Sequence, residues 1–95
     1  MQDDRRLQLV VTPLAAGGHE LTAVITATNV PETVLTVHAP DTVVIQGPTK
    51  EVVGVGFFQR TLHWRVIHAQ RGHRSLIEFQ LSAGPLAQTA LCKIL

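Results

Sequence analysis

The sequence predicts an all-β protein, organised as a two-sheet antiparallel sandwich of about seven strands in a single domain spanning residues 1–95. Val, Ile and Thr supply 27 of the 95 residues, and these β-branched side chains fit a pleated surface better than a helix. Between Pro and Gly residues the chain falls into strand-length segments without the three-four spacing of an amphipathic helix. Hydrophobic residues make up 45% and charged residues 16% of the chain, a composition that favours folding around one core.

The first two segments have the alternating pattern of half-buried strands. In segment 5–12, Leu7, Leu9 and Val11 share one side of the strand, and the segment ends at Pro13. The paired glycines 17–18 that follow favour a turn. Segment 20–30 has the clearest alternation in the chain, with threonines opposite its apolar side. The residues of these strands that we expect to face the core are Leu7, Leu9, Val11, Leu21, Ala23, Ile25 and Ala27.

The middle of the chain holds three shorter segments, 33–39, 42–46 and 50–56, separated by Pro and Gly residues. Glycines 54 and 56 in the last of them indicate a bulge or an irregular edge. Strands spaced by roughly 8 to 12 residues are typical of a sandwich or a small barrel. A barrel needs long, matched strands, so the short and interrupted middle segments favour the sandwich.

The last third of the chain is expected to form a hairpin and a final strand. Segments 61–69 and 74–82 both alternate, and the polar residues 70–73 between them include a glycine, so we expect the two segments to pair. Segment 88–95 would be the last strand, and Trp64 is the best single marker of the core. The residues of these segments expected to face inward are Leu62, Trp64, Val66, Ile77, Phe79, Leu81, Ala90, Cys92 and Ile94.

About two thirds of the chain resembles bacterial immunoglobulin-like domains of the CARDB kind. Segment 61–69 with its tryptophan, then Gly72, then the alternating segment 76–84 is similar to their closing hairpin. The Thr-rich stretch 22–37, which reaches Asn29 before its next strand, resembles their earlier strand pair. The resemblance implies an immunoglobulin-like sandwich and a non-catalytic spacer, adhesion or docking module, outside the cell or in the cell envelope.

Charge and hydropathy narrow the range of partners. The formal net charge is +1, so the long-range field is too weak to recruit nucleic acid or an anionic membrane. The chain has no run of roughly 18 to 20 apolar residues, so no membrane span is expected. Residues 1–6 are mostly polar, and they are not followed by the apolar core and small-residue cleavage site of a signal peptide. Both a cytoplasmic protein and an excised or mature segment of a longer one therefore remain open.

No residue pattern predicts catalysis or a cofactor. Serines and carboxylates are scattered, and the single cysteine, Cys92, is expected to be a small apolar core residue without a disulfide. The protein is therefore expected not to be an enzyme. Among five histidines, His38 and His63 share the outward side of their strands with Glu78, which makes these three weak candidates for a metal site.

The uncharged stretch 52–58 is the main candidate for contact with a partner. Its adjacent residues Phe57 and Phe58 cannot both face one core from an extended strand. Either one ring lies at a rim or in a partner contact, or a bulge lets both tuck under a sheet edge. Apolar side chains on the outer faces of other strands, namely Val24, Val30, Leu91 and Leu95, favour a protein partner or self-association.

These observations predict a non-enzymatic structural, docking or assembly module that makes protein–protein contacts, as a small accessory subunit or as a domain of a larger surface assembly. A virion or filament surface protein is an alternative that differs only in its partner. A small metal or ligand carrier that uses histidines on one sheet face is the alternative from another functional class.

Overall fold

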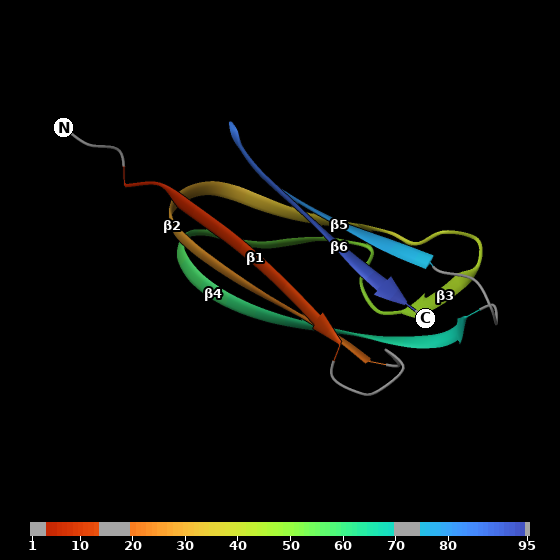
Figure 1. The fold of residues 1–95 in the computed structure, drawn as a ribbon. Coiled ribbons are helices and arrows are strands. Elements are labelled where there is room, and N and C mark those ends of the chain that lie inside the picture. The colour runs from red at the N-terminus through yellow and green to blue at the C-terminus, as the bar shows by residue number, and fades with distance from the viewer. Residues whose placement is uncertain (1–3, 14–19, 70–74, 95) are drawn as a thin grey trace.

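A computed structural model of the protein describes residues 4–13, 20–69 and 75–94 (Figure 1). These residues form an all-β fold, a single antiparallel sheet of six strands in the order β3-β4-β2-β5-β6, with β1 also paired to β2. The strands are β1 (Arg6–Pro13), β2 (Glu20–His38), β3 (Val43–Gln46), β4 (Lys50–Ala69), β5 (Ser75–Ala83) and β6 (Leu86–Ile94). The predicted turns at 17–18 and 70–73 lie outside the described residues.

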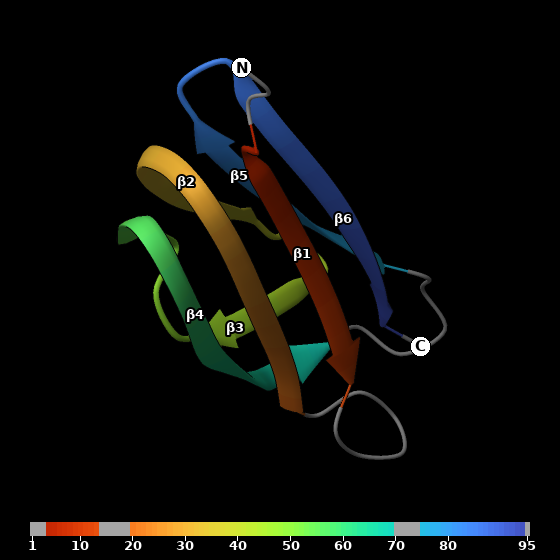
Figure 2. The same cartoon turned by 90° about the vertical axis from the view of Figure 1, so that its left-hand side faces the viewer.

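The two longest strands, β2 and β4, pair antiparallel over most of their length and bend together. Register shifts interrupt their pairing between Ala27 and Val34 of β2. In this region Asn29 of β2 and Gly56 of β4 have φ angles of 53° and 77°. These left-handed residues and the shifted register let the two-stranded ribbon turn over (Figure 2). The sheet therefore folds back on itself, and its two halves face each other.

Strands β2 and β4 run through both halves, and we name each half by its own edge strand, β1 or β6. In the β1 half, β1 pairs with residues 21–28 of β2, the later part of β4 pairs with residues 20–27 of β2, and β3 pairs with residues 65–69 of β4. In the β6 half, β5 pairs with residues 34–38 of β2 and with β6. Strands β1 and β6 then lie side by side, one from each half (Figure 2).

The structure has fewer and longer strands than the sequence predicts. Segments 20–30 and 33–39 are one strand, β2, and segments 50–56 and 61–69 are one strand, β4. The predicted breaks are real irregularities, but hydrogen bonding resumes on both sides of them, so the strands continue. Pro31, which has no N–H to donate, lies within the register shift, where the ladder does not need its donor. The result is six strands in one sheet, not seven in two.

The expected hairpin of segments 61–69 and 74–82 is wrong. β4 pairs with β2 and β3, whereas β5 pairs with β2 and β6, so the two segments lie in opposite halves. Trp64 and Phe79 consequently meet across the core, with ring centroids 5.0 Å apart and planes at 71°, an edge-to-face contact. The same period-two alternation suits two strands in one sheet and two strands in facing parts of a sheet, so the sequence pattern does not distinguish the two arrangements. The tight hairpin is β5 to β6, through Gly84 at φ 60°.

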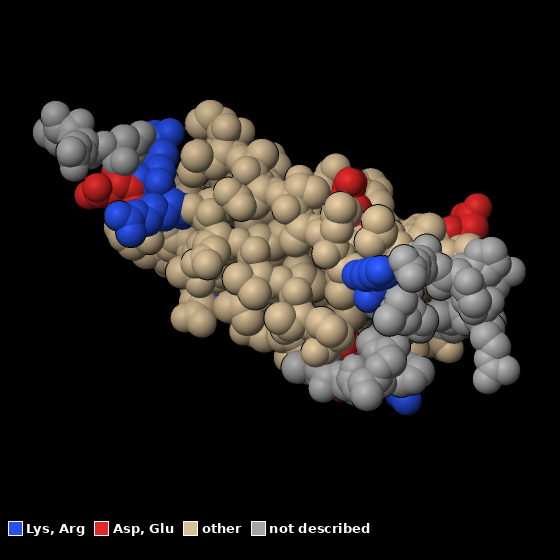
Figure 3. Space-filling model, in the orientation of Figure 1, with Lys and Arg blue, Asp and Glu red and all other residues tan. Residues whose placement is uncertain are grey.

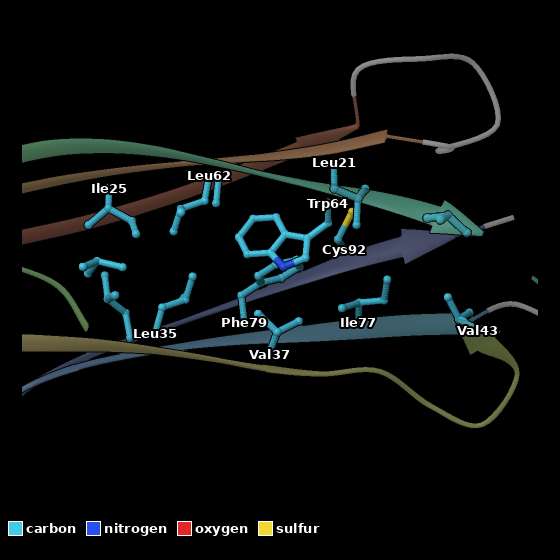
Figure 4. Packing of buried hydrophobic residues seen from close by; sticks show 14 residues of the cluster. Leu21, Ile25, Leu35, Val37, Val43, Leu62, Trp64, Ile77, Phe79 and Cys92 are labelled. Atoms are coloured by element: carbon cyan, nitrogen blue, oxygen red, sulfur yellow. The ribbon is translucent and has the colours of Figure 1, made fainter. Parts of the chain in front are cut away.

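The core is formed by inward side chains of both halves (Figure 4). The sequence prediction of inward residues is confirmed for β2, β4 and β5 and for Cys92 of β6, whereas Leu7, Leu9 and Val11 of β1 and Ala90 of β6 are only partly buried. Val30 of β2, expected on an outer face, is buried, because it lies where the register shifts. The buried residues of the main cluster are Leu21, Ala23, Ile25, Leu35, Val37, Val43, Val53, Leu62, Trp64, Val66, Ile77, Phe79, Leu81 and Cys92. Burial of this apolar surface is the main term that stabilises the fold.

Residues 47–49 carry the chain from β3 in the β1 half to the start of β4 in the β6 half. Trp64 Nε1 donates a hydrogen bond to the Pro48 carbonyl oxygen at 2.6 Å. At the other side of the crossover, the Val37 backbone N donates to the Thr49 carbonyl oxygen at 2.8 Å. Gly47 has φ 147°, and a Cβ there would overlap Trp64 Cδ1. The crossover is therefore fixed against the largest side chain of the core.

Cys92 lies in the core opposite Ile77 of β5 and is a free cysteine. Burial raises the pKa of the Cys92 thiol above its ordinary value, because the apolar surroundings disfavour the thiolate. The folded chain thus holds the thiol proton more tightly than the unfolded chain. This group therefore lowers stability as the pH rises above the ordinary cysteine pKa and has no effect well below it.

We expect a thiol reagent such as DTNB to modify native Cys92 at least ~10-fold more slowly than it modifies the urea-unfolded chain at about pH 8. The physical reason is the combination of a raised pKa and restricted access. The rates are compared by absorbance under matched reagent concentrations. Equal rates in the two states would show that the thiol is accessible.

Candidate interaction surface

The two adjacent phenylalanines of β4 point in opposite directions. Phe58 points inward, is half-buried and packs over Gly54, where an added Cβ would lie 2.7 Å from ring atoms of Phe58. Phe57 points outward and is 75% exposed. The arrangement in which both rings tuck under a sheet edge is therefore not the one observed. Val55, two residues before Phe57, is also 66% exposed.

Phe57 belongs to the outer face of the β1 half. From Phe57 onward β4 alternates with period two, so Phe57 lies on the same side as Gln59, Thr61 and His63. The strand pairing continues this side across β2 and β1: Val10 lies opposite Val24, and Val24 lies opposite Thr61. We call this surface the β1 face, formed by Gln8, Val10, Thr12, Thr22, Val24, Thr26, Thr28, Phe57, Gln59, Thr61 and His63.

None of the residues that form the β1 face is Lys, Arg, Asp or Glu. Charged side chains on this side of the sheet begin at its ends, with Arg6 at one end and the cross-strand partners Glu20 and Arg65 at the other. Figure 3 views the molecule from the side of β1 and β6 and shows blue side chains at the start of β1 and uncharged surface along the middle of the strand. A sheet face normally intersperses charges of both signs, so this neutrality is unusual.

The charged residues of β4 nearest to Phe57 are turned to the other side of the strand. Arg60 Nη2 forms an ion pair with Glu51 Oε1 at 2.9 Å, and Arg60 Nη1 donates to the Val53 carbonyl oxygen at 3.4 Å. The second carboxylate oxygen of Glu51 is buried without a hydrogen-bond partner. This pair is partly exposed and contributes little to stability. Its effect on the β1 face is to keep both charges away from it.

The three weak metal candidates do not come together. His38 and Glu78 are cross-strand partners in the β6 half, where Glu78 Oε1 accepts a hydrogen bond from Gln80 Nε2 at 2.7 Å. His63 lies on the β1 face of the other half, with its Nδ1 3.3 Å from Thr22 Oγ1. Among the described residues, no group of three His, Cys, Asp or Glu side chains is placed to hold a metal ion.

The other predicted contact residues fall on two surfaces. Val24 is half-buried at the centre of the β1 face, whereas Leu91 is 60% exposed on the outer face of the β6 half. Sequence reasoning did not single out Val10, which is 45% exposed beside Val24. Its outward parity was visible in the sequence, but only the pairing of β1 with β2 brings the two valines together.

Two surface hollows are lined by described residues. One, of about 270 Å³, is lined by Glu20, Gln46, His63, Trp64 and Arg65. The other, of about 480 Å³, lies between the start of β1 and the start of β6 and is lined by Arg5, Arg6, Leu7, Gln8, Leu86, Ala87 and Gln88. The first lining contains His63 but no Ser or Cys, and the second contains no His.

Comparison of the chain with protein-family models and with curated proteins finds no match. Among the described residues there is no helix with the length and apolar character needed to cross a membrane. The exposed aromatic ring on an uncharged sheet face is thus the feature from which a function can be inferred.

Proposed function

We propose that the protein is a non-enzymatic docking or assembly module that binds a protein partner through the β1 face. The observation that carries this proposal is Phe57, a large aromatic side chain left 75% exposed at one end of an uncharged surface. Aromatic residues are enriched at the centres of protein interfaces, and charged residues are depleted there. A sheet face that stays in contact with water gains no stability from an exposed aromatic ring or from a lack of charged residues.

The gain from covering Phe57 is large enough to matter for binding. A phenylalanine side chain buries roughly 200 Å² when fully covered. Removing the exposed three quarters from water is worth about 1–2 kcal/mol before the cost of ordering is counted. This exceeds what a single surface ion pair of about 0–1 kcal/mol provides. The β1 face therefore offers one strong anchor with a weaker apolar contribution from Val10 and Val24.

We further propose an immunoglobulin-like topology for the fold. The order β1-β2-β4-β3 in one half matches the A-B-E-D order of a constant-type domain, and β6-β5-β2 in the other half matches G-F-C. The start of β4 adds a further strand beside β2 in the second half, which the constant-type sheet lacks. In this assignment the bent strand β2 serves as both B and C. The assignment supports the resemblance to extracellular spacer and docking domains, although a fold by itself does not establish a function.

Substitution of Phe57 by serine is expected to weaken partner binding or self-association at least ~10-fold, because the anchor is lost. Partner binding is measured as the amount of partner protein retained on the immobilised chain. Self-association is measured by sedimentation of the purified chain. The fold is expected to persist, with a loss of up to about 1 kcal/mol from the lower β-propensity of serine.

The matched control is Leu76→Ser, which removes a 51% exposed apolar residue from the outer face of the β6 half. This variant is expected to bind as the wild type does. If both variants lose binding equally, general surface hydrophobicity explains the association. If neither variant loses it, the β1 face is not the docking surface.

The virion or filament alternative uses the same surface and differs only in which molecule occupies it. The metal-carrier alternative is not favoured, because the described residues do not bring its candidate ligands together.

A further inference from the structure

We propose that the partner of the β1 face is a second copy of this chain, so that two β1 faces pack in a symmetric dimer. This inference rests on the proposed docking function and names its occupant. A twofold interface brings the same surface patch of both subunits together, so the chemical groups of the patch must be able to pack against copies of themselves. The side chains of the β1 face meet this requirement.

The polar groups of the β1 face are chemically self-complementary. They are the hydroxyls of Thr residues, the amides of Gln8 and Gln59, and the imidazole of His63. A hydroxyl, an amide and a neutral imidazole each donate and accept hydrogen bonds, so each can pair with a copy of itself. Lysine ammonium and carboxylate groups cannot, because each has only one hydrogen-bonding role and repels its own kind. The absence of all charged types from this face thus removes the groups that would oppose self-packing.

The area of the face is sufficient for a weak dimer. Three strands about 4.8 Å apart and eight residues long at about 3.3 Å per residue cover roughly 380 Å² in projection. The accessible area is larger than this projection because side chains corrugate the surface. Two copies then approach the lower limit of about 1,200 Å² for specific interfaces. We therefore expect association in the micromolar range, with each copy contributing one Phe57 anchor.

The exposed apolar residues outside this face fit a dimer less well. Leu76 and Leu91 on the outer face of the β6 half lie among charged neighbours, namely Glu78 and Lys93. A sheet face without charged side chains is the more suitable surface for packing against its own copy.

The test is sedimentation equilibrium of the purified chain from about 5 to about 500 µM. The wild type is expected to change from monomer to dimer over this range. Thr61→Lys, at an exposed position opposite Val24, is expected to raise the dissociation constant at least ~10-fold, because twofold symmetry buries two like charges. The matched control is Thr89→Lys on the outer face of β6, which should dimerise as the wild type does.

Circular dichroism and thermal melting establish that each variant is folded, and Thr26→Lys replaces Thr61→Lys if the latter is not. A wild type that remains monomeric at about 500 µM overturns the dimer, as does a dimer that Thr61→Lys leaves unchanged. If the wild type is monomeric but Phe57→Ser still releases a captured protein, the docking function stands and only its occupant is different. If neither self-association nor Phe57-dependent capture is found, both proposals fail.

Discussion

Replacement of Trp64 by alanine is expected to lower the free energy of unfolding by about 3–5 kcal/mol. Trp64 is 2% exposed at the centre of the core and contacts Phe79 edge to face. Its Nε1 also donates to the Pro48 carbonyl oxygen, which ties the crossover to the core. The alanine variant would leave a cavity between the two halves and deprive this carbonyl of its partner. A loss of this size is a large part of the 5–15 kcal/mol by which domains are ordinarily stable.

The measurement is urea unfolding followed by circular dichroism, since Trp64 is the only tryptophan and its fluorescence is lost in the variant. If Trp64→Ala does not fold, Trp64→Phe gives the result, because it keeps an aromatic ring against Phe79 and removes the N–H donor. We expect this conservative variant to lose about 1–3 kcal/mol. A loss below about 1 kcal/mol for the alanine variant would show that the two halves do not depend on the indole.

Replacement of Gly47 by alanine is expected to cost about 2–4 kcal/mol, from two separate causes. The φ of 147° is rarely adopted by residues with a Cβ, and the added Cβ would overlap the indole of Trp64 and lie 3.0 Å from the His63 carbonyl oxygen. Because Trp64 is packed and hydrogen-bonded, it cannot move aside without disturbing the core. The loss is measured by urea unfolding of the variant and the wild type.

Gly56→Ala separates the two causes. Gly56 also has a positive φ, of 77°, but no atom lies within 4 Å of an added Cβ. This variant should therefore lose only the backbone term, about 1–2 kcal/mol. Equal losses at Gly47 and Gly56 would mean that the contact with Trp64 has no energetic consequence.

The candidate surface was visible in the sequence only in part. Adjacent Phe57 and Phe58 left two arrangements open, one ring outside the core or both rings tucked under a sheet edge by a bulge, and the parity of a strand does not say which of its two sides is inside. Gly54 and Gly56 added a further ambiguity, because a bulge between them shifts the parity. In the structure, Phe58 packs over Gly54 and Phe57 is left outside. Leu91, predicted for the same role as Val24, lies on the opposite half because strand pairing separates them.

The outcome for the metal candidates has the same cause. His38, His63 and Glu78 all have outward parity, and His38 and Glu78 do become cross-strand partners. His63 also points outward, but it lies in the β1 half, whose outer face is on the opposite side of the molecule from the outer face of the β6 half. Parity constrains a residue relative to its own strand and contains no information about the neighbouring strand.

The amino-acid sequence by itself determined that this chain is all-β and which side of β2, β4 and β5 faces the core, from Leu21 and Ile25 to Trp64 and Phe79. These properties depend on β-branched side chains and period two, which act between residues close in the chain. The tertiary structure alone decided that β2 and β4 continue through their bends, that β4 and β5 lie in opposite halves, and that Phe57 and Val24 share one uncharged face. Those outcomes depend on pairing between distant segments and on burying the rings of Trp64 and Phe79 together, and neither interaction leaves a periodic signal in the sequence.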